Sequence, residues 1–156
     1  TGINIDLNPF AIDLFKFVRP KDINICAALS NKKKAAKLFY HHDLSSQNTL
    51  SPSHVKWMKT HFRLNNLSVK NVKTEKLKDI LDKHNIKKID FLNIDIEGAD
   101  LEALQSINFK VYQPKIICVE IMDEIKKESS IYKFLSNLRY KKVWSSKSGF
   151  NHIFVN

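Results

Sequence analysis

Hydrophobic and polar residues follow two different periods along the chain, and segments of the two kinds alternate. Short apolar stretches that are typical of strands occur at residues 2–6, 23–30, 36–42, 67–72, 89–98 and 114–122. Segments in which apolar residues recur every three or four positions, as on one face of a helix, occur at residues 9–18, 74–85, 99–105 and 129–138. This alternation predicts an α/β fold with a mostly parallel sheet.

Local sequence signals predict where these elements begin and end. Asn8 followed by Pro9 is a favourable helix start, and Thr74 is expected to cap a later helix. Residues 36–42 form a strand that can fold back as a hairpin, and residues 41–54 are predicted to be a polar loop. The inner helix faces are expected to carry Ala11, Leu14, Phe15 and Val18, then Leu77, Ile80, Leu81 and His84, then Leu101 and Leu104, then Ile131, Phe134, Leu135 and Leu138. VWSS and NHIFVN are expected to pair as a terminal antiparallel hairpin around Gly149.

Composition narrows the class of protein. The 156 residues are the length of one domain, and no apolar run approaches the about 20 residues that span a membrane. Cys26 and Cys118 lie in apolar stretches and are predicted to be buried, reduced thiols, which favours a cytoplasmic protein. The net charge is +10, with 23 lysines among 26 basic residues. Scattered lysines favour a solvated surface over a nucleic-acid interface, which stays open as an alternative.

Acidic side chains stand at the ends of three predicted strands. The stretch FLNIDIEGADLEAL places Asn93, Asp95 and Glu97 on one strand face by simple alternation, and Gly98 allows a tight turn into the next helix. Asp6 and Glu120 end two other strands. Because open α/β sheets bind ligands at the carboxyl ends of their strands, we expect these acids to share a ligand site. Alternatively, Glu97, Asp100 and Glu102 only complement the positive end of the following helix dipole.

Two further residue types bear on this site. An acid at the end of a strand in a nucleotide-binding fold, like Asp6, can accept hydrogen bonds from ribose hydroxyls. The six histidines show neither HxxxH nor HExxH spacing, so the sequence predicts no dedicated metal site. His41 or His42, at the edge of the polar loop, is a possible general base, although a surface role is the commoner one.

With these residues in hand, the chain resembles the FkbM family of S-adenosylmethionine-dependent methyltransferases. KIDFLNIDIEGADLEAL is similar to the family's strand-and-helix signature, and INIDLNP, ICAALSNKKKAAKLFYHHDLSSQNTLS, PKIICVEI and NHIFVN follow in the family's order. The chain departs from the family pattern at Asp6-Leu7, where Glu-Pro is usual, at Asn93, where lysine is usual, and at Asp100, where glutamate is usual. The Asn93 change removes a positive charge beside Asp95 and alters its electrostatics.

The resemblance implies a Rossmann-like class I methyltransferase sheet with S-adenosylmethionine as cofactor. The implied cofactor-binding residues are Asp6, Asn8, Ala28, Leu29 and Asp95, and the implied catalytic residues are Asp95, Glu97 and Glu120. The implied reaction is methylation of a hydroxyl on a sugar, glycolipid or secondary metabolite. The family's first strand and glycine-rich loop are expected upstream of Thr1, with that strand central between the strands at 2–6 and 89–98, so we expect the isolated chain to be less stable than the complete domain.

Two alternatives of other classes stay open at this point. One is a truncated, non-catalytic copy that keeps the fold and holds no cofactor. The other is a basic module that binds nucleic acid, for which the charge of +10 is the only sign.

Overall fold

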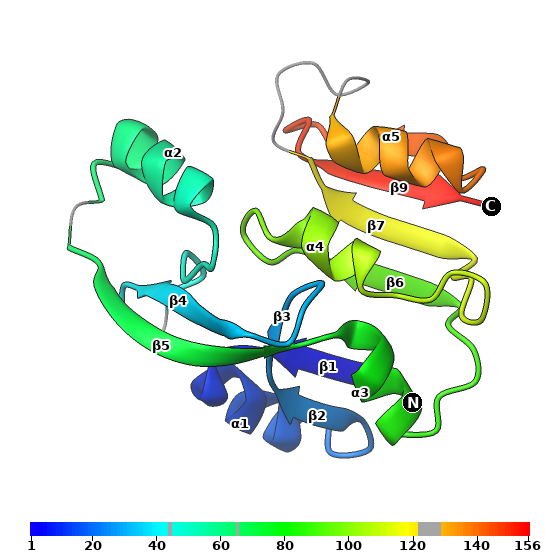
Figure 1. Cartoon of the computed structure of the whole chain (residues 1–156), viewed down its shortest axis with the longest axis horizontal. Helices are drawn as coiled ribbons and strands as arrows, with labels where there is room; N and C mark the ends of the chain where they lie inside the picture. Colours follow the sequence, from blue (N-terminus) through cyan, green and yellow to red (C-terminus); the bar gives the residue numbers. More distant parts are fainter. Residues whose placement is uncertain (44, 65, 122–128) are drawn as a thin grey trace.

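The structure is a computed structural model that describes residues 1–43, 45–64, 66–121 and 129–156. Strands and helices alternate along much of the chain, as the residue pattern predicts (Figure 1). The strands are β1 (Ile3–Asp6), β2 (Ile23–Cys26), β3 (Ala28–Leu29), β4 (Ala35–Tyr40), β5 (Ser68–Glu75), β6 (Phe91–Ile94), β7 (Ile116–Glu120), β8 (Lys141–Ser145) and β9 (Asn151–Val155). The helices are α1 (Pro9–Val18), α2 (Pro52–Phe62), α3 (Leu77–Lys83), α4 (Asp100–Gln105) and α5 (Ser130–Asn137). The end of the strand predicted at 114–122, Met122, lies outside the described residues.

The described strands form three sheets instead of one. β1 pairs with β2, β5 lies between β3 and β4, and the third sheet has the order β6-β7-β9-β8. The pairs β1–β2, β3–β5 and β6–β7 are parallel, whereas β4–β5, β7–β9 and β8–β9 are antiparallel. The terminal hairpin is confirmed, with Gly149 at φ +77° in its turn. A mostly parallel single sheet was the wrong expectation, and no ladder joins β1 to β6 in the ranges that the structure describes.

The stretch predicted as one strand at 23–30 is divided at Ala27. The Ala27 amide donates to the carbonyl of Asp6 (2.9 Å), whereas the Ser30 amide donates to the carbonyl of Glu75 (3.0 Å). The chain therefore leaves β1 and joins β5 within a few residues. β4 pairs along its whole length with β5, from Ala35↔Lys73 to Tyr40↔Ser68, and so does not fold back on the strand before it.

The larger core lies under the third sheet. Ile117, Val119 and Phe154 are fully buried there beneath Leu104 of α4 and Leu135 of α5. The inner face predicted for α5 is confirmed, since its apolar residues all pack on this core. A second, smaller core gathers around Leu77 and Leu81 of α3, and side chains of β1 contact it.

The starts of α1 and α5 agree with the sequence signals, whereas the buried face of α1 does not. Asn8 caps α1 by accepting from the Phe10 amide (3.0 Å), and Ser129 caps α5 by accepting from the Tyr132 amide (3.0 Å). The inner face predicted for α1 is wrong, however. Ile12 is its one buried residue, while Leu14 and Val18 are exposed.

Two other helix predictions are corrected by the structure. Thr74 belongs to β5, where its hydroxyl donates to the carbonyl of Lys32 (2.7 Å), so it caps no helix. The predicted loop at 41–54, of which residue 44 is not described, ends at Ser51, because α2 begins at Pro52. Ser51 and Pro52 repeat the cap-and-proline signal of α1, which identifies this helix start from sequence alone.

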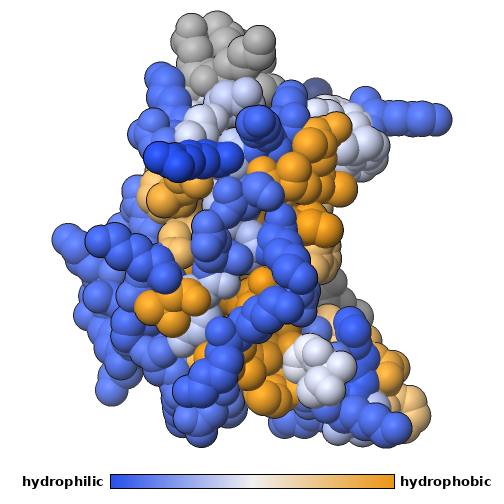
Figure 2. Space-filling model, turned by 90° about the vertical axis from the view of Figure 1, so that its right-hand side faces the viewer, coloured by the Kyte–Doolittle hydropathy of each residue, from blue (hydrophilic) through white to orange (hydrophobic). Residues whose placement is uncertain are grey.

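Strands β1, β2, β6 and β7 point toward the side of α2, so their carboxyl ends and the loop before α2 lie on one side of the molecule (Figure 1). Both termini lie on the opposite side. Figure 2 views that opposite side, where hydrophilic side chains cover most of the surface and hydrophobic ones lie between them. In the described ranges, no helix is long and apolar enough to cross a membrane.

The two cysteines differ in burial. Cys26 is exposed and Cys118 is partly buried, and both are free thiols. The prediction that both are buried is therefore wrong for Cys26. It is the last residue of β2, which lies at the edge of a two-stranded sheet.

Candidate functional site

The carboxylates predicted to meet at the carboxyl ends of the strands are found there. Asp6 ends β1, Glu120 ends β7, and Asp95 follows directly after β6. β6 ends at Ile94, however, so Asp95 and Glu97 belong to the turn after the strand and not to one face of it. Glu97 has φ +56° and Gly98 has φ +87°, a left-handed pair that breaks the strand alternation.

A buried aspartate holds this turn. Asp100 is 2% exposed, and its carboxylate accepts from the amides of Gly98 (3.1 Å) and Ile96 (3.3 Å). Burial raises the pKa of Asp100 to about 6, although these backbone donors act in the opposite direction. Asp100 therefore organises the turn from within, which is more than the helix-dipole role considered for it.

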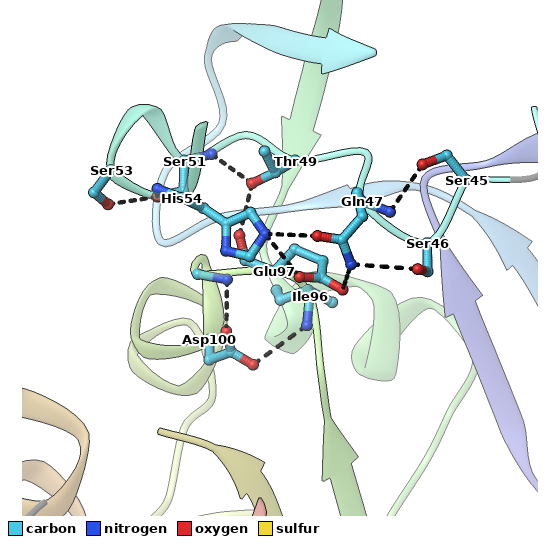
Figure 3. Close-up of polar contacts among 11 residues, drawn as sticks. Ser45, Ser46, Gln47, Thr49, Ser51, Ser53, His54, Ile96, Glu97 and Asp100 are labelled. Carbon is cyan, nitrogen blue, oxygen red and sulfur yellow. Dashed lines mark hydrogen bonds and ion pairs between the residues drawn. The ribbon is translucent and has the colours of Figure 1, made fainter. Parts of the chain in front are cut away.

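The side chain of Glu97 faces a histidine that comes from α2 (Figure 3). Its Oε2 lies 2.9 Å from Nε2 of His54, and the two side chains are 18% and 2% exposed. Gln47 completes the group, since its Nε2 donates to Glu97 Oε1 (3.3 Å) while its Oε1 lies 3.4 Å from His54 Nε2. One carboxylate, one imidazole and one amide thus form a closed set of polar contacts.

The loop before α2 is attached to the turn by hydroxyl groups. Thr49 donates from Oγ1 to the carbonyl of Glu97 (2.6 Å), and the Ser51 amide donates to the same hydroxyl (2.9 Å). Ser51 in turn accepts from the His54 amide (3.2 Å) as the cap of α2. A Cβ on Gly98 would lie 3.1 Å from Ser51 Oγ and 3.2 Å from His54 Cβ, so the close approach of loop and turn requires glycine there.

The first of two pockets at this edge, which we call the cofactor-side pocket, has a volume of about 330 Å³. One wall is apolar and comes from β1, α1 and the segment after β2. In the part of the chain that the structure describes, four carboxylates and no lysine or arginine line it, although the whole chain carries a charge of +10. The carboxylates belong to Asp6, Asp43, Asp95 and Glu97.

Hydrogen bonds fix two polar residues of this pocket. Asp6 Oδ1 accepts a hydrogen bond from the Asn8 amide (2.8 Å). Among the described residues, Asp6 Oδ2 has no hydrogen-bond partner. Asn8 caps α1 and donates from Nδ2 to the carbonyl of Asp43 (2.5 Å), which connects β1 to the polar loop. Two causes raise the pKa of Asp95, of which partial burial of its carboxyl is the larger and the nearby Glu97 carboxylate the smaller. The residue as a whole is nevertheless exposed to solvent.

The second pocket, which we call the α2-side pocket, lies across the turn and measures about 380 Å³. His54 and Trp57 of α2 line it together with Glu120, and Leu101 and Ile131 add apolar surface. Burial raises the pKa of Glu120 to about 7, and Asp95, Glu97 and Asp100 add to the shift while His54 opposes it. In the described part of the chain, Glu120 Oε2 is buried without a hydrogen-bond partner.

The structure thus brings most of the predicted site residues together. Asp6, Asn8, Leu29, Asp95 and Glu97 line the cofactor-side pocket, and Glu120 lines the α2-side pocket. Ala28 is 5% exposed and does not line the first pocket, where its neighbour Ala27 does.

Sequence reasoning missed the residues that α2 contributes. It considered His41 and His42 as possible bases, whereas His54 is the histidine that contacts Glu97. The Ser51-Pro52 signal identifies α2, and a helix that begins there places His54 in its first turn. The packing of this first turn against the Glu97–Gly98 turn depends on tertiary contacts, such as the one between His54 and Glu97, which are 43 positions apart.

Other kinds of site find less support here. Among the residues that the structure describes, no three histidine, cysteine, aspartate or glutamate side chains converge as metal ligands. Asn93 is exposed on β6 and is paired in register with Cys118 of β7.

Comparison with known proteins gives one match. The family model described as "Methyltransferase FkbM domain" matches residues 1–142, nearly the whole chain. No curated protein and no solved structure matches the chain significantly.

Proposed function

This chain belongs to the FkbM methyltransferase family, and on that premise we propose that it transfers a methyl group from S-adenosylmethionine to a hydroxyl oxygen of a small-molecule or glycan acceptor. When bound, the cofactor supplies a methyl group on a positively charged sulfur. The proposed acceptor is a sugar, a glycolipid or a secondary metabolite. Cys26 is an exposed free thiol, which fits a protein in the reducing cytoplasm. We also propose that residues 1–156 form one domain.

The observation that carries this proposal is the charge of the cofactor-side pocket. Four carboxylates and no cationic side chain surround a pocket with an apolar wall, in a chain whose surface is strongly basic. Such a lining attracts a ligand that has an apolar ring system and positive charge, and it opposes nucleic-acid phosphates. S-adenosylmethionine combines an adenine ring, ribose hydroxyls, an ammonium group and a sulfonium. The residues present therefore fit the cofactor that the family implies.

Each predicted residue has a proposed role. Asp6, with one oxygen held by the Asn8 amide, accepts hydrogen bonds from the ribose hydroxyls. Ala28 and Leu29 support the adenine ring, Leu29 by direct contact and the buried Ala28 from behind the pocket wall. Asp95 and Glu97 line the cofactor-side pocket, and Glu97 contacts His54 of the α2-side pocket, so their proposed role is where donor and acceptor meet. Glu120 orients the acceptor hydroxyl.

Calorimetric titration of the protein with S-adenosylmethionine and with S-adenosylhomocysteine tests the proposal. We expect binding to the wild type and a loss of about 10- to 100-fold in affinity for Asp6→Asn, because a charged acceptor of hydrogen bonds is worth about 1.5–3 kcal/mol. Asp13→Asn is the matched control, since Asp13 lies on exposed α1 and pairs only with Lys16 at 2.9 Å among the contacts described. Equal affinity in Asp6→Asn and wild type would refute the ribose role.

One observation favours a second candidate, a chain that keeps the fold without methyl transfer. β1 and β6, whose ends carry Asp6 and Asp95, share no hydrogen-bonded ladder in the described ranges. The spacing of these two carboxylates is then set by contacts outside a strand ladder, such as the second core and the hydrogen bond from Asn8 to Asp43. If the wild type binds neither S-adenosylmethionine nor S-adenosylhomocysteine, the non-catalytic alternative is the correct one.

A further inference from the structure

We propose that the α2-side pocket receives the acceptor and that His54 is the general base that takes the proton of the acceptor hydroxyl. This inference rests on the proposed function and adds a catalytic residue and a location for the acceptor. It starts from an observation that the methyl-donor site does not explain. The Nε2 atom of a buried histidine on α2 lies 2.9 Å from the carboxylate of a glutamate, in the turn that separates two pockets.

The contacts of His54 determine which ring nitrogen carries the proton. Gln47 Nε2 donates to Glu97 Oε1, which fixes the orientation of the amide and directs Gln47 Oε1 toward the histidine. His54 Nε2 therefore faces two acceptors, Glu97 Oε2 at 2.9 Å and Gln47 Oε1 at 3.4 Å. Only a protonated Nε2 satisfies this arrangement. In the neutral ring, Nδ1 is then the atom with a free electron pair.

The geometry leaves Nδ1 available for a ligand. Figure 3 shows Nε2 directed at Glu97 and Gln47, with the second ring nitrogen on the side of the ring away from them. No hydrogen bond to Nδ1 is found in the described part of the chain, and His54 lines the α2-side pocket. The arrangement is that of a histidine base oriented by a carboxylate, in which the carboxylate sets the tautomer and stabilises the imidazolium that forms.

The remaining lining indicates the chemistry of the acceptor. Trp57 offers an aromatic face and Leu101 and Ile131 offer apolar surface, while Glu120 presents a buried oxygen without a partner in the described residues. Among the described residues, no lysine or arginine lines the pocket. An aromatic side chain beside carboxyl groups suits an uncharged ring with several hydroxyls and disfavours phosphorylated or carboxylated groups at this position.

The proton balance of the reaction requires such a base. The acceptor oxygen gains the methyl group and must lose its own proton, while the electron pair of the broken carbon–sulfur bond stays on sulfur. His54 Nδ1 accepts that proton, and the Glu97 carboxylate compensates the positive charge on the ring. The proton then passes to solvent, which restores the neutral histidine for the next turnover.

Imidazole nitrogen NMR on the ¹⁵N-labelled protein tests the tautomer without any ligand. We expect His54 at pH 8 to be neutral with its proton on Nε2, and Glu97→Gln to change this signal more than the matched variant Glu75→Gln, whose side chain is exposed at the end of β5. A proton on Nδ1 in the neutral wild type would overturn the proposal. So would a doubly protonated ring at pH 8, because a permanently charged histidine is a structural ion pair and not a base.

Binding and turnover are tested with methyl α-D-mannoside, methyl β-D-galactoside and methyl α-L-rhamnoside as probes. We expect saturation-transfer NMR signals from at least one of them in the presence of S-adenosylhomocysteine, and loss of these signals in Trp57→Ala. With radiolabelled S-adenosylmethionine, His54→Gln should lower kcat/KM for that glycoside by about 100-fold or more, with unchanged affinity for S-adenosylhomocysteine. His84→Gln, at the end of α3 and outside both pockets, is the control variant.

The outcomes separate this inference from the proposed function. Failure of the wild type to bind S-adenosylhomocysteine contradicts the proposed function itself. Cofactor binding without a signal from any of the three glycosides, or without methyl transfer to one that binds, overturns the acceptor pocket. Wild-type kcat/KM in His54→Gln overturns the role of His54 and leaves the cofactor site standing.

Discussion

The strands near the two ends of the chain differ in how deeply their side chains are buried. In the sheet formed by β6, β7, β9 and β8, Ile117, Val119 and Phe154 are completely buried. No residue of β1 or β2 reaches that degree of burial, and α1 exposes Phe17 by 83%. We call the sheet of β6, β7, β9 and β8, together with α4 and α5, the packed half, because it is covered and has a well-packed core. We call β1, α1 and β2 the open half, which carries one wall of the cofactor-side pocket.

This difference shows where rigidity and ligand contact lie. The turn with Asp95, Glu97 and Asp100 extends from the packed half, where burial fixes its backbone. Asp6 and Asn8 belong to the open half, which is connected to that turn through the polar loop and the second core. The packed half therefore holds the turn in place, and the open half supplies the opposite wall of the cofactor-side pocket.

The largest expected effect tests the comparison with two identical substitutions. Phe154→Ala removes a side chain that is fully buried and should lower the free energy of unfolding by about 3–5 kcal/mol. Phe17→Ala removes an exposed ring and should change it by less than about 0.5 kcal/mol. Urea unfolding followed by circular dichroism measures both. Similar losses in the two variants would show that α1 is covered in solution and that the halves are not different.

The junction between loop and turn gives the next effect in size. Gly98→Ala combines a positive φ with close contacts to Ser51 and His54, so we expect a loss of about 2–3 kcal/mol. Gly149→Ala has a similar φ of +77° with open space around it, and should cost about 1 kcal/mol. Equal losses in the same unfolding assay would mean that backbone conformation, and not the contact with α2, explains the requirement for glycine.

The smallest effect concerns the charge of Glu120. Its pKa in the folded protein is about 7, above the ordinary value of 4.5, so the folded state favours the protonated form. The stability that this gives is present below about pH 4.5 and is lost as the pH rises through about 7. Glu120→Gln should therefore match the wild type near pH 4 and exceed it at pH 8 by about 1 kcal/mol, a value reduced for solvent screening.

Thermal or urea unfolding of Glu120→Gln at both pH values measures this difference. Glu75→Gln removes the same charge from an exposed position at the end of β5 and serves as the control. An equal gain in the control would contradict a local cause and would point to relief of a long-range interaction instead.

Much of the local structure could be predicted from the residue pattern. Asn8 was expected at a helix start, and residues 129–138 were expected to form a helix. Asn8 and Ser129 cap α1 and α5, because a short polar side chain before a helical segment satisfies free amides whatever the surroundings. The strands of the terminal hairpin were likewise predictable from apolar runs around a glycine turn. The buried face of α1 could not be predicted, since amphipathic spacing shows which residues can be buried together and not whether another layer covers them.

The candidate site shows the same distinction between features set by local sequence and features set by tertiary packing. The sequence alone determined the strand-end acids Asp6, Asp95 and Glu120, the glycine turn and the family, because strand periodicity and a short motif are properties of neighbouring residues. Tertiary structure decided that three sheets form and that β4 pairs with β5. It also decided that His54 meets Glu97, which lies 43 positions further along the chain. Such contacts depend on how distant segments pack and on which polar groups must find partners once they are buried, and no local pattern records that.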